Sequence, residues 1–183
     1  MEHRSIGLME TTSVAKGVES ADEMVKAASV DLIMARAACP GKYLAMVAGE
    51  VGAVQNAMEA GKRVVGEFLV DTFVIPNVHP AVFPALSALT RIREPGSLGI
   101  IETFSVASAI MAADAAVKEA EVELIEVRCA TGLAGKSFLM LTGDVGSVNS
   151  AIEAGLEAVS DSGLILSHVV IPSPSEELFG CLC

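Results

Sequence analysis

Aromatic and basic residues are scarce in the 183-residue sequence. Tryptophan is absent, Tyr43 is the single tyrosine and phenylalanine occurs six times. Proteins that bind single-stranded nucleic acid stack bases on aromatic side chains, and few are available here. Twelve Lys and Arg stand against 23 Asp and Glu, which gives a formal net charge of −11. Because binding to a phosphate backbone needs clustered cations, we do not expect nucleic acid as a partner.

Long apolar runs are also missing, although 52% of the residues are hydrophobic. Stretches such as residues 43–48 and 164–166 are far shorter than the roughly 20 residues that cross a bilayer, so we expect no membrane association. Residues 1–12 carry several charges and lack the apolar core of a secretory signal. These absences predict a cytoplasmic protein.

Recognisable catalytic arrangements are missing as well. The three histidines are scattered and do not combine with serine and aspartate into a hydrolytic triad. Residues 130–135 form a glycine-rich loop, but it lacks the lysine and serine or threonine of a phosphate-binding loop. We therefore do not expect an enzyme.

The sequence does contain an internal repeat. Residues 6–36 align with residues 98–128 at an offset of 92, with 15 identities in 31 positions. Residues 41–61 align with residues 135–155 at an offset of 94, with 11 identities in 21 positions. The second copy therefore has two extra residues in one loop. Repetition at this level indicates two homologous domains.

The repeat divides the chain into two predicted domains. We assign residues 1–90 to the first domain, 91–97 to a linker and 98–183 to the second domain, which ends in a short mobile tail after Pro174. A domain of about 90 residues buries only about two thirds of its extended-chain surface, so each half needs a partner. Similar halves arranged head to tail form a ring if their rotation closes. Glu10 and Glu102 occupy equivalent positions, which favours a role in the fold over acid–base chemistry.

Within one copy, the hydrophobic period changes from strand to helix and back. The first copy predicts strands at residues 5–10, 31–38, 43–49 and 67–75, and helices at residues 15–28 and 51–65. The Pro-Gly pair of Cys39-Pro40-Gly41-Lys42 favours a tight turn between two strands. This β-α-β-β-α-β order predicts an α/β (α+β) protein of two tandem ferredoxin-like domains, with the helices of each on one face of an antiparallel sheet.

The repeated motifs resemble those of the bacterial microcompartment shell family, in its tandem-domain class. The motifs that carry the resemblance are Ser5-Ile6-Gly7 with Ser97-Leu98-Gly99, Asp22 to Lys26 with Asp114 to Lys118, and Gly49-Glu50-Val51 with Gly143-Asp144-Val145. The resemblance implies a homotrimer that imitates a hexagon, a pseudohexamer, and that tiles with other shell proteins around metabolic enzymes.

The resemblance also implies which residues contact neighbouring tiles. Lys26 and Lys118 match the lysines at the tile edge, although a solvated helix lysine is the alternative. His79 is either an edge contact or an ordinary turn histidine. Asn77 and Ser173 follow the two Ile-Pro pairs, at positions where many single-domain relatives carry arginine. We therefore expect the contacts between tiles to differ there from the common pattern.

In this family the hairpin between the second and third strands points toward the ring centre. The resemblance therefore implies a pore lined by Cys39, Pro40 and Gly41 of the first copy. The second copy would contribute Thr131, Gly132, Leu133 and Ala134.

Cys39 matches the pore cysteine of the iron–sulfur-carrying shell proteins of propanediol-utilization-type compartments. Three Cys39 thiolates on the axis can hold three irons of a [4Fe-4S] cluster, and the fourth iron takes a non-protein ligand. A free pore thiol and another metal remain alternatives.

The other cysteines have simpler interpretations, since cysteines in a cytoplasmic chain stay reduced. Cys129 is interpreted as structural, and Cys181 and Cys183 as an oxidation-prone tail. A cluster would serve electron transfer across the shell or delivery to encapsulated redox enzymes. A plain tile whose pore passes small metabolites is the alternative. A soluble regulatory ligand-binding protein is a third possibility, because fold alone does not fix function.

Overall fold

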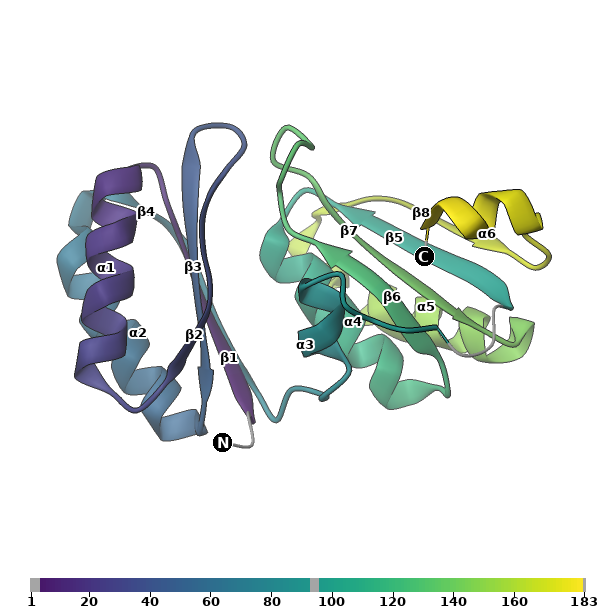
Figure 1. Cartoon of the computed structure of the whole chain (residues 1–183), viewed down its shortest axis with the longest axis horizontal. Helices are drawn as coiled ribbons and strands as arrows, with labels where there is room; N and C mark the ends of the chain where they lie inside the picture. Colours follow the sequence, from purple (N-terminus) through teal and green to yellow (C-terminus); the bar gives the residue numbers. More distant parts are fainter. Residues whose placement is uncertain (1–3, 93–95, 183) are drawn as a thin grey trace. The chain divides into compact units, whose positions relative to one another are not determined.

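The chain folds into two compact units. A computed structural model describes residues 4–92 and 96–182, and its contacts divide the chain into Met1–Val78 and His79–Cys183 (Figure 1). Each unit contains one copy of the repeat. The linker predicted at residues 91–97 includes three residues, 93–95, that lie outside the described part of the chain, as does Cys183.

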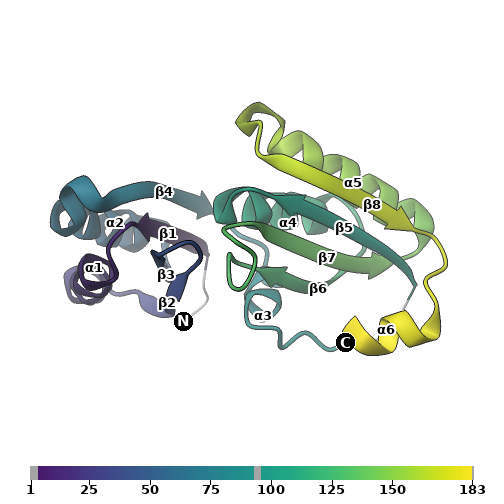
Figure 2. The same ribbon diagram turned by 90° about the horizontal axis from the view of Figure 1, so that it is seen from above.

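The first unit is a four-stranded antiparallel sheet with two helices on one face (Figure 2). Its strand order is β2-β3-β1-β4, which confirms the predicted β-α-β-β-α-β fold. The elements are β1 (Ser5–Thr11), α1 (Val14–Ala27), β2 (Asp31–Ala38), β3 (Lys42–Gly49), α2 (Val51–Val65), a 3-10 turn (Gly66–Phe68) and β4 (Leu69–Pro76). The last strand begins two residues later than predicted, because the 3-10 turn occupies that segment.

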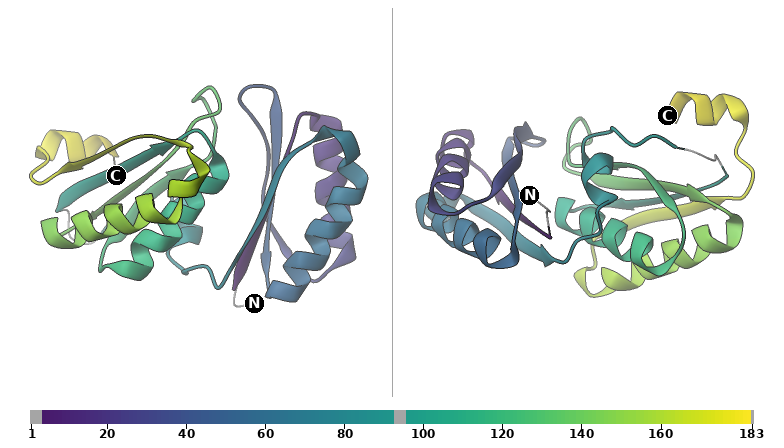
Figure 3. Two further views of the ribbon diagram at one scale, coloured as in Figure 1. Left: turned by 180° about the vertical axis from the view of Figure 1, so that it is seen from behind. Right: turned by 60° about the horizontal axis from the view of Figure 1, so that its bottom comes forward.

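The second unit repeats this architecture, with strand order β6-β7-β5-β8 and helices α4 and α5 on one face (Figure 3). It also contains two short helices that flank the repeated elements. The elements are α3 (Val82–Leu86), β5 (Ser97–Thr103), α4 (Val106–Glu119), β6 (Glu123–Arg128), β7 (Ser137–Gly143), α5 (Val145–Ala158), a 3-10 turn (Ser160–Ser162), β8 (Ile165–Ile171) and α6 (Glu176–Leu182). None of the described helices is long and apolar enough to span a membrane.

The same short motif starts the first helix of each copy. Ser13 is the N-cap of α1, and its hydroxyl accepts a hydrogen bond from the Lys16 amide at 3.3 Å. Ser105 caps α4 in the same way through the Ser108 amide, at 3.4 Å. An N-cap serine satisfies an amide that has no partner within the helix. The conserved spacing within the repeat therefore fixes where both helices begin.

The prediction of a mobile tail after Pro174 is wrong. Residues 176–182 form α6, whose first turn contains Glu176 and Glu177. Its Phe179 is 8% exposed and packs on the sheet face that α4 and α5 leave open, against Leu98, Ile125 and Met140. Burial of one aromatic side chain on an apolar sheet stabilises this short helix, which helical propensity alone would not.

The two copies differ in how α1 and α4 approach their sheets. Gly17 of α1 faces Tyr43 of β3, and a Cβ atom at position 17 would lie 2.7 Å from Tyr43 Cγ. The equivalent positions in the second copy are Ala109 and Ser137. In the first copy, the large Tyr43 on the strand faces a helix position without a side chain, Gly17. In the second copy, the small Ser137 faces the methyl group of Ala109. Close packing requires this complementarity.

We expect Gly17→Ala to lower the free energy of unfolding by about 1–3 kcal/mol, because the added methyl group overlaps the Tyr43 ring. The measurement is urea unfolding followed by circular dichroism. In a Tyr43→Ser background, which reproduces the pair of the second copy, the same change should cost less. Equal costs in both backgrounds would contradict this account of the packing.

Candidate functional site

The hairpin between β2 and β3 presents Cys39 at its tip. Ala38 pairs with Lys42, so Cys39, Pro40 and Gly41 form the turn. All three turn residues are exposed. Gly41 has a φ of +68°, a left-handed conformation that glycine adopts without steric cost. The predicted turn is therefore present, and the Cys39 thiol lies exposed and outside any disulfide.

An ion pair connects the base of this hairpin to β1. Lys42 Nζ lies 2.7 Å from Glu10 Oε1, and the Glu10 side chain is only 12% exposed. The second copy contains the equivalent pair, Lys136 with Glu102, also at 2.7 Å. Partial burial makes such a pair more resistant to screening by salt than a fully exposed pair. Both glutamates thus hold hairpins in place, in agreement with a role in the fold.

The hairpin between β6 and β7 has a longer tip that contains the four predicted pore residues of the second copy. Thr131, Gly132 and Ala134 are exposed and Leu133 is half-buried. The Leu133 carbonyl accepts a hydrogen bond from the Lys136 amide at 3.0 Å. Ala134 has a φ of +51°, which is uncommon for a residue with a side chain. The two tips therefore differ in both backbone conformation and chemistry.

Cys129 does not occupy the position of Cys39 in space. It follows β6 directly, is completely buried, and its thiol contacts the Val127 carbonyl at 3.9 Å. This burial supports its interpretation as a structural residue. Of the two tips, only the one in the first copy presents an exposed cysteine.

A single chain does not assemble a metal site within residues 4–92 and 96–182. No three His, Cys, Asp or Glu side chains gather there in an arrangement that could hold a metal ion. Cys39 nevertheless has the chemistry of an iron–sulfur ligand, since its thiol is exposed and unpaired with another cysteine. A cluster would therefore need thiolates from several chains.

Asp114 brings together two of the three predicted edge residues. Its Oδ1 accepts a hydrogen bond from the His79 amide at 2.7 Å, and its Oδ2 lies 2.5 Å from Lys118 Nζ. His79 Nδ1 in turn accepts a hydrogen bond from the Ala81 amide at 3.3 Å. Asp114 is 7% exposed. The sequence shows the Asp-to-Lys spacing of one helical turn, but not the long-range contact with His79.

Lys26 lies in the equivalent position on α1, where it forms an ion pair with Asp22. The side-chain hydrogen bond to Asp22, together with the charge of that carboxylate, raises the pKa of Lys26 above its ordinary value. Both side chains of this pair are more than half exposed. Lys26 thus remains charged and accessible at the surface of the first unit.

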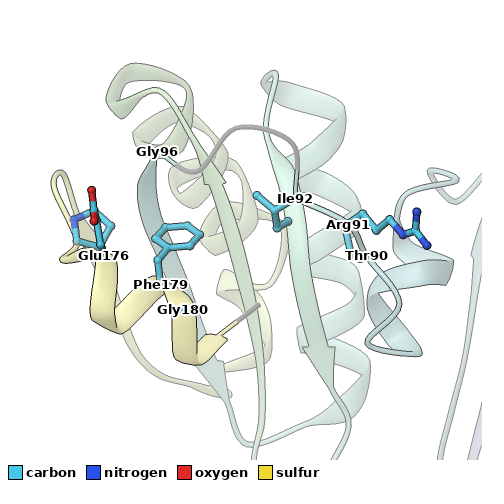
Figure 4. A pocket seen from close by; sticks show the side chains of 8 residues that line it. Thr90, Arg91, Ile92, Gly96, Glu176, Phe179 and Gly180 are labelled. Atoms are coloured by element: carbon cyan, nitrogen blue, oxygen red, sulfur yellow. The ribbon is translucent and has the colours of Figure 1, made fainter.

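A pocket of about 910 Å³ lies between α6 and the segment that precedes β5, all within the second unit (Figure 4). It is lined by Thr90, Arg91, Ile92, Gly96, Pro174, Glu176, Phe179 and Gly180. Among the residues that the structure describes, the lining contains neither cysteine nor histidine. It therefore does not compete with the Cys39 hairpin as a site for an iron–sulfur cluster.

The BMC domain family matches this chain twice, at residues 5–78 and 97–174. The bacterial microcompartment shell protein PduT of Citrobacter freundii is 44% identical over 176 residues, which cover 96% of each chain. The carboxysome assembly protein CcmO of Synechocystis is 31% identical over 188 residues, which cover 95% of this chain and 63% of CcmO.

A solved structure has the same fold along nearly the whole chain. The crystal structure of a microcompartments protein from Desulfitobacterium hafniense DCB matches with a TM-score of 0.94 and 50% identity. The match covers 97% of this chain and 99% of that protein. The tandem arrangement described above is thus shared with a protein whose structure is known.

The contrast between the two hairpins predicts different cysteine reactivities. In metal-free native protein, iodoacetamide should modify Cys39 at least ~10-fold faster than Cys129, because the buried thiol reacts only after local opening. Peptide mass spectrometry gives the rate at each cysteine. Denaturant should remove the difference. Equal rates in the native protein would contradict the burial of Cys129.

Proposed function

Because the chain belongs to the BMC domain family of bacterial microcompartment shell proteins, we propose that it assembles into a homotrimer whose six domains imitate a hexagonal tile. Two units of the same topology in one chain support this proposal, since three such chains supply six similar domains. Rings of this kind follow from head-to-tail contacts whose rotation closes. The tile would pack with other shell proteins through edges that include Lys26, Lys118 and His79.

The observation that carries the rest of the proposal is the exposed thiol of Cys39 at a hairpin tip. In the proposed trimer, the tips of both hairpins line a central pore. One tip in each chain carries Cys39, and the other carries residues 131–134 without cysteine. The pore would therefore contain three thiols related by threefold symmetry.

Three thiolates with threefold symmetry fit one face of a [4Fe-4S] cluster, whose own threefold axis passes through the remaining iron. The three copies of Cys39 would hold three irons, and a non-protein ligand would complete the fourth. The cluster would supply one-electron transfer. Within each chain, the Gly41 turn shapes the tip and the Lys42–Glu10 pair supports its base. The tile would then transfer electrons across the shell, or deliver clusters to encapsulated redox enzymes.

A plain metabolite pore is the second candidate function. It is favoured by the small number of ligands, since each chain offers a single exposed thiol at the tip and the described residues contain no metal-binding group of three. In that case Cys39 would only line the opening. The two functions differ in whether the purified protein contains iron and sulfide.

We expect anaerobically purified protein to contain about four irons and four sulfides per three chains and to absorb visible light. Cys39→Ser should abolish both the metal and the colour. Cys181→Ser is the matched control, because Cys181 is also exposed but lies outside the hairpin, and it should keep the cluster. A colourless wild-type protein after reconstitution with iron and sulfide would favour the plain pore.

The mass of the assembly tests the trimer independently of the cluster. Light scattering should give close to three times the 18.8 kDa mass of the chain. Cys39→Ser should give the same mass, because in the proposed trimer the domains of neighbouring chains contact each other directly and assembly does not need the cluster. A wild-type monomer at every concentration would contradict the shell tile itself.

A further inference from the structure

One stripe of side chains is exposed on α1, while the equivalent stripe on α4 is buried. The stripe on α1 consists of Val14, Val18, Asp22 and Val25, which share one face of the helix. Their repeat equivalents are Val106, Ile110, Asp114 and Val117. The three valines of α1 are 40–50% exposed, whereas the three apolar residues of α4 are 0–9% exposed. The repeat has thus kept an apolar stripe that only the second copy buries.

The difference is specific to this pair of helices. Helices α2 and α5 have nearly the same pattern of burial in the two copies: Val54 and Val148 are both buried, and Glu59 and Glu153 are both exposed. The neighbouring strands β2 and β6, in contrast, differ in burial in the same way as α1 and α4. Leu32 of β2 is 44% exposed, while its equivalent, Leu124 of β6, is 1% exposed. The stripe and Leu32 together form a surface, here called the α1 face.

In the second unit, the equivalent surface is contacted by the segment that follows β4. The amide of His79 donates to Asp114 at 2.7 Å, and α3 packs against β6 and α4. On the α1 face, Asp22 forms an ion pair with Lys26, as Asp114 does with Lys118. Among the described residues, however, no backbone amide donates to Asp22. Residues 4–92 and 96–182 therefore place no such segment on the α1 face.

The repeat identifies the missing segment. Ile75-Pro76 at the end of β4 corresponds to Ile171-Pro172 at the end of β8, so His79 corresponds to Ser175. Ser175 is exposed, and its carbonyl and hydroxyl oxygens accept hydrogen bonds from the amides of Phe179 and Leu178 in α6. These bonds hold Ser175 at the start of the helix through its acceptors and do not involve its amide.

We propose that the α1 face binds residues 172–175 of a second copy of this chain, the segment between β8 and α6, while α6 stays packed on its own sheet. The amide of the partner's Ser175 donates to Asp22 there, as the His79 amide donates to Asp114 within the chain. The proposal deepens the proposed homotrimer and rests on it. Each chain has one α1 face and one such segment, so contacts of this kind link chains head to tail, and a threefold rotation closes them into the proposed trimer.

Two substitutions on the α1 face test the contact. Asp22→Arg removes the acceptor, and Val18→Glu places a charge within the apolar stripe. Each should weaken assembly about 30-fold or more. Asp22→Arg would leave the partner's amide opposite a positive charge, and Val18→Glu would bury a charge that has no partner. Analytical ultracentrifugation over a range of concentrations measures the change. Far-UV circular dichroism should show an unchanged fold, since both positions are exposed in the single chain.

Glu59→Arg is the matched control. Glu59 lies on α2 of the same unit, is ion-paired with a lysine as Asp22 is, and its side chain is 64% exposed compared with 60% for Asp22. It should assemble like the wild-type protein. If Asp22→Arg and Val18→Glu assemble like Glu59→Arg, the proposed contact is wrong while the trimer stands. A wild-type protein that is monomeric at every concentration would overturn both.

Substitutions at position 175 test whether the backbone amide of Ser175 donates the proposed hydrogen bond to Asp22. Ser175→Pro removes the amide hydrogen, whereas Ser175→Ala keeps it and removes only the hydroxyl that caps α6. Assembly should be weaker in Ser175→Pro than in Ser175→Ala. Equal assembly of the two variants would show that this amide does not hold Asp22.

Discussion

Each four-stranded sheet has two apolar faces, and its own pair of helices covers only one of them. This constraint governs most of what surrounds the repeated elements. In the first unit, Ile6, Leu8 and Met46 point away from the helices and are nonetheless at most 2% exposed. In the second unit, Phe179 and Ile92 pack on the corresponding face. A domain of this size has little interior of its own, so short additional segments that cover the second sheet face become part of the fold.

The repeated core could be predicted from the sequence because local patterns determine it. The bounds of β2 and α2 are those predicted, since alternation and helical spacing are unambiguous there. The tight turn at Pro40 and Gly41 also follows from residue type. The helix α6 could not be predicted in this way, because a helix of seven residues is stable only when Phe179 packs on the sheet. The contact between His79 and Asp114 likewise depends on residues 35 positions apart.

The two copies have diverged by compensation within the core and by loop length and side-chain chemistry at the hairpin tips. Gly17 with Tyr43 and Ala109 with Ser137 are two solutions to the same packing problem between a helix and a strand. At the hairpin tips there is no such exchange of volume. The first tip is short and exposes a thiol, and the second is longer and has alanines in left-handed conformations. Divergence that packing does not explain concentrates where the site is expected.

Joining the two copies in one chain also fixes the composition of any ring that such chains form. Separate single-domain proteins, one with and one without a cysteine at the tip, would mix in rings according to their relative abundance in the cell. A peptide linkage between the copies fixes the ratio of thiol-bearing to thiol-free hairpins at one to one. In a ring built from such chains, the arrangement of thiols would then be independent of expression level.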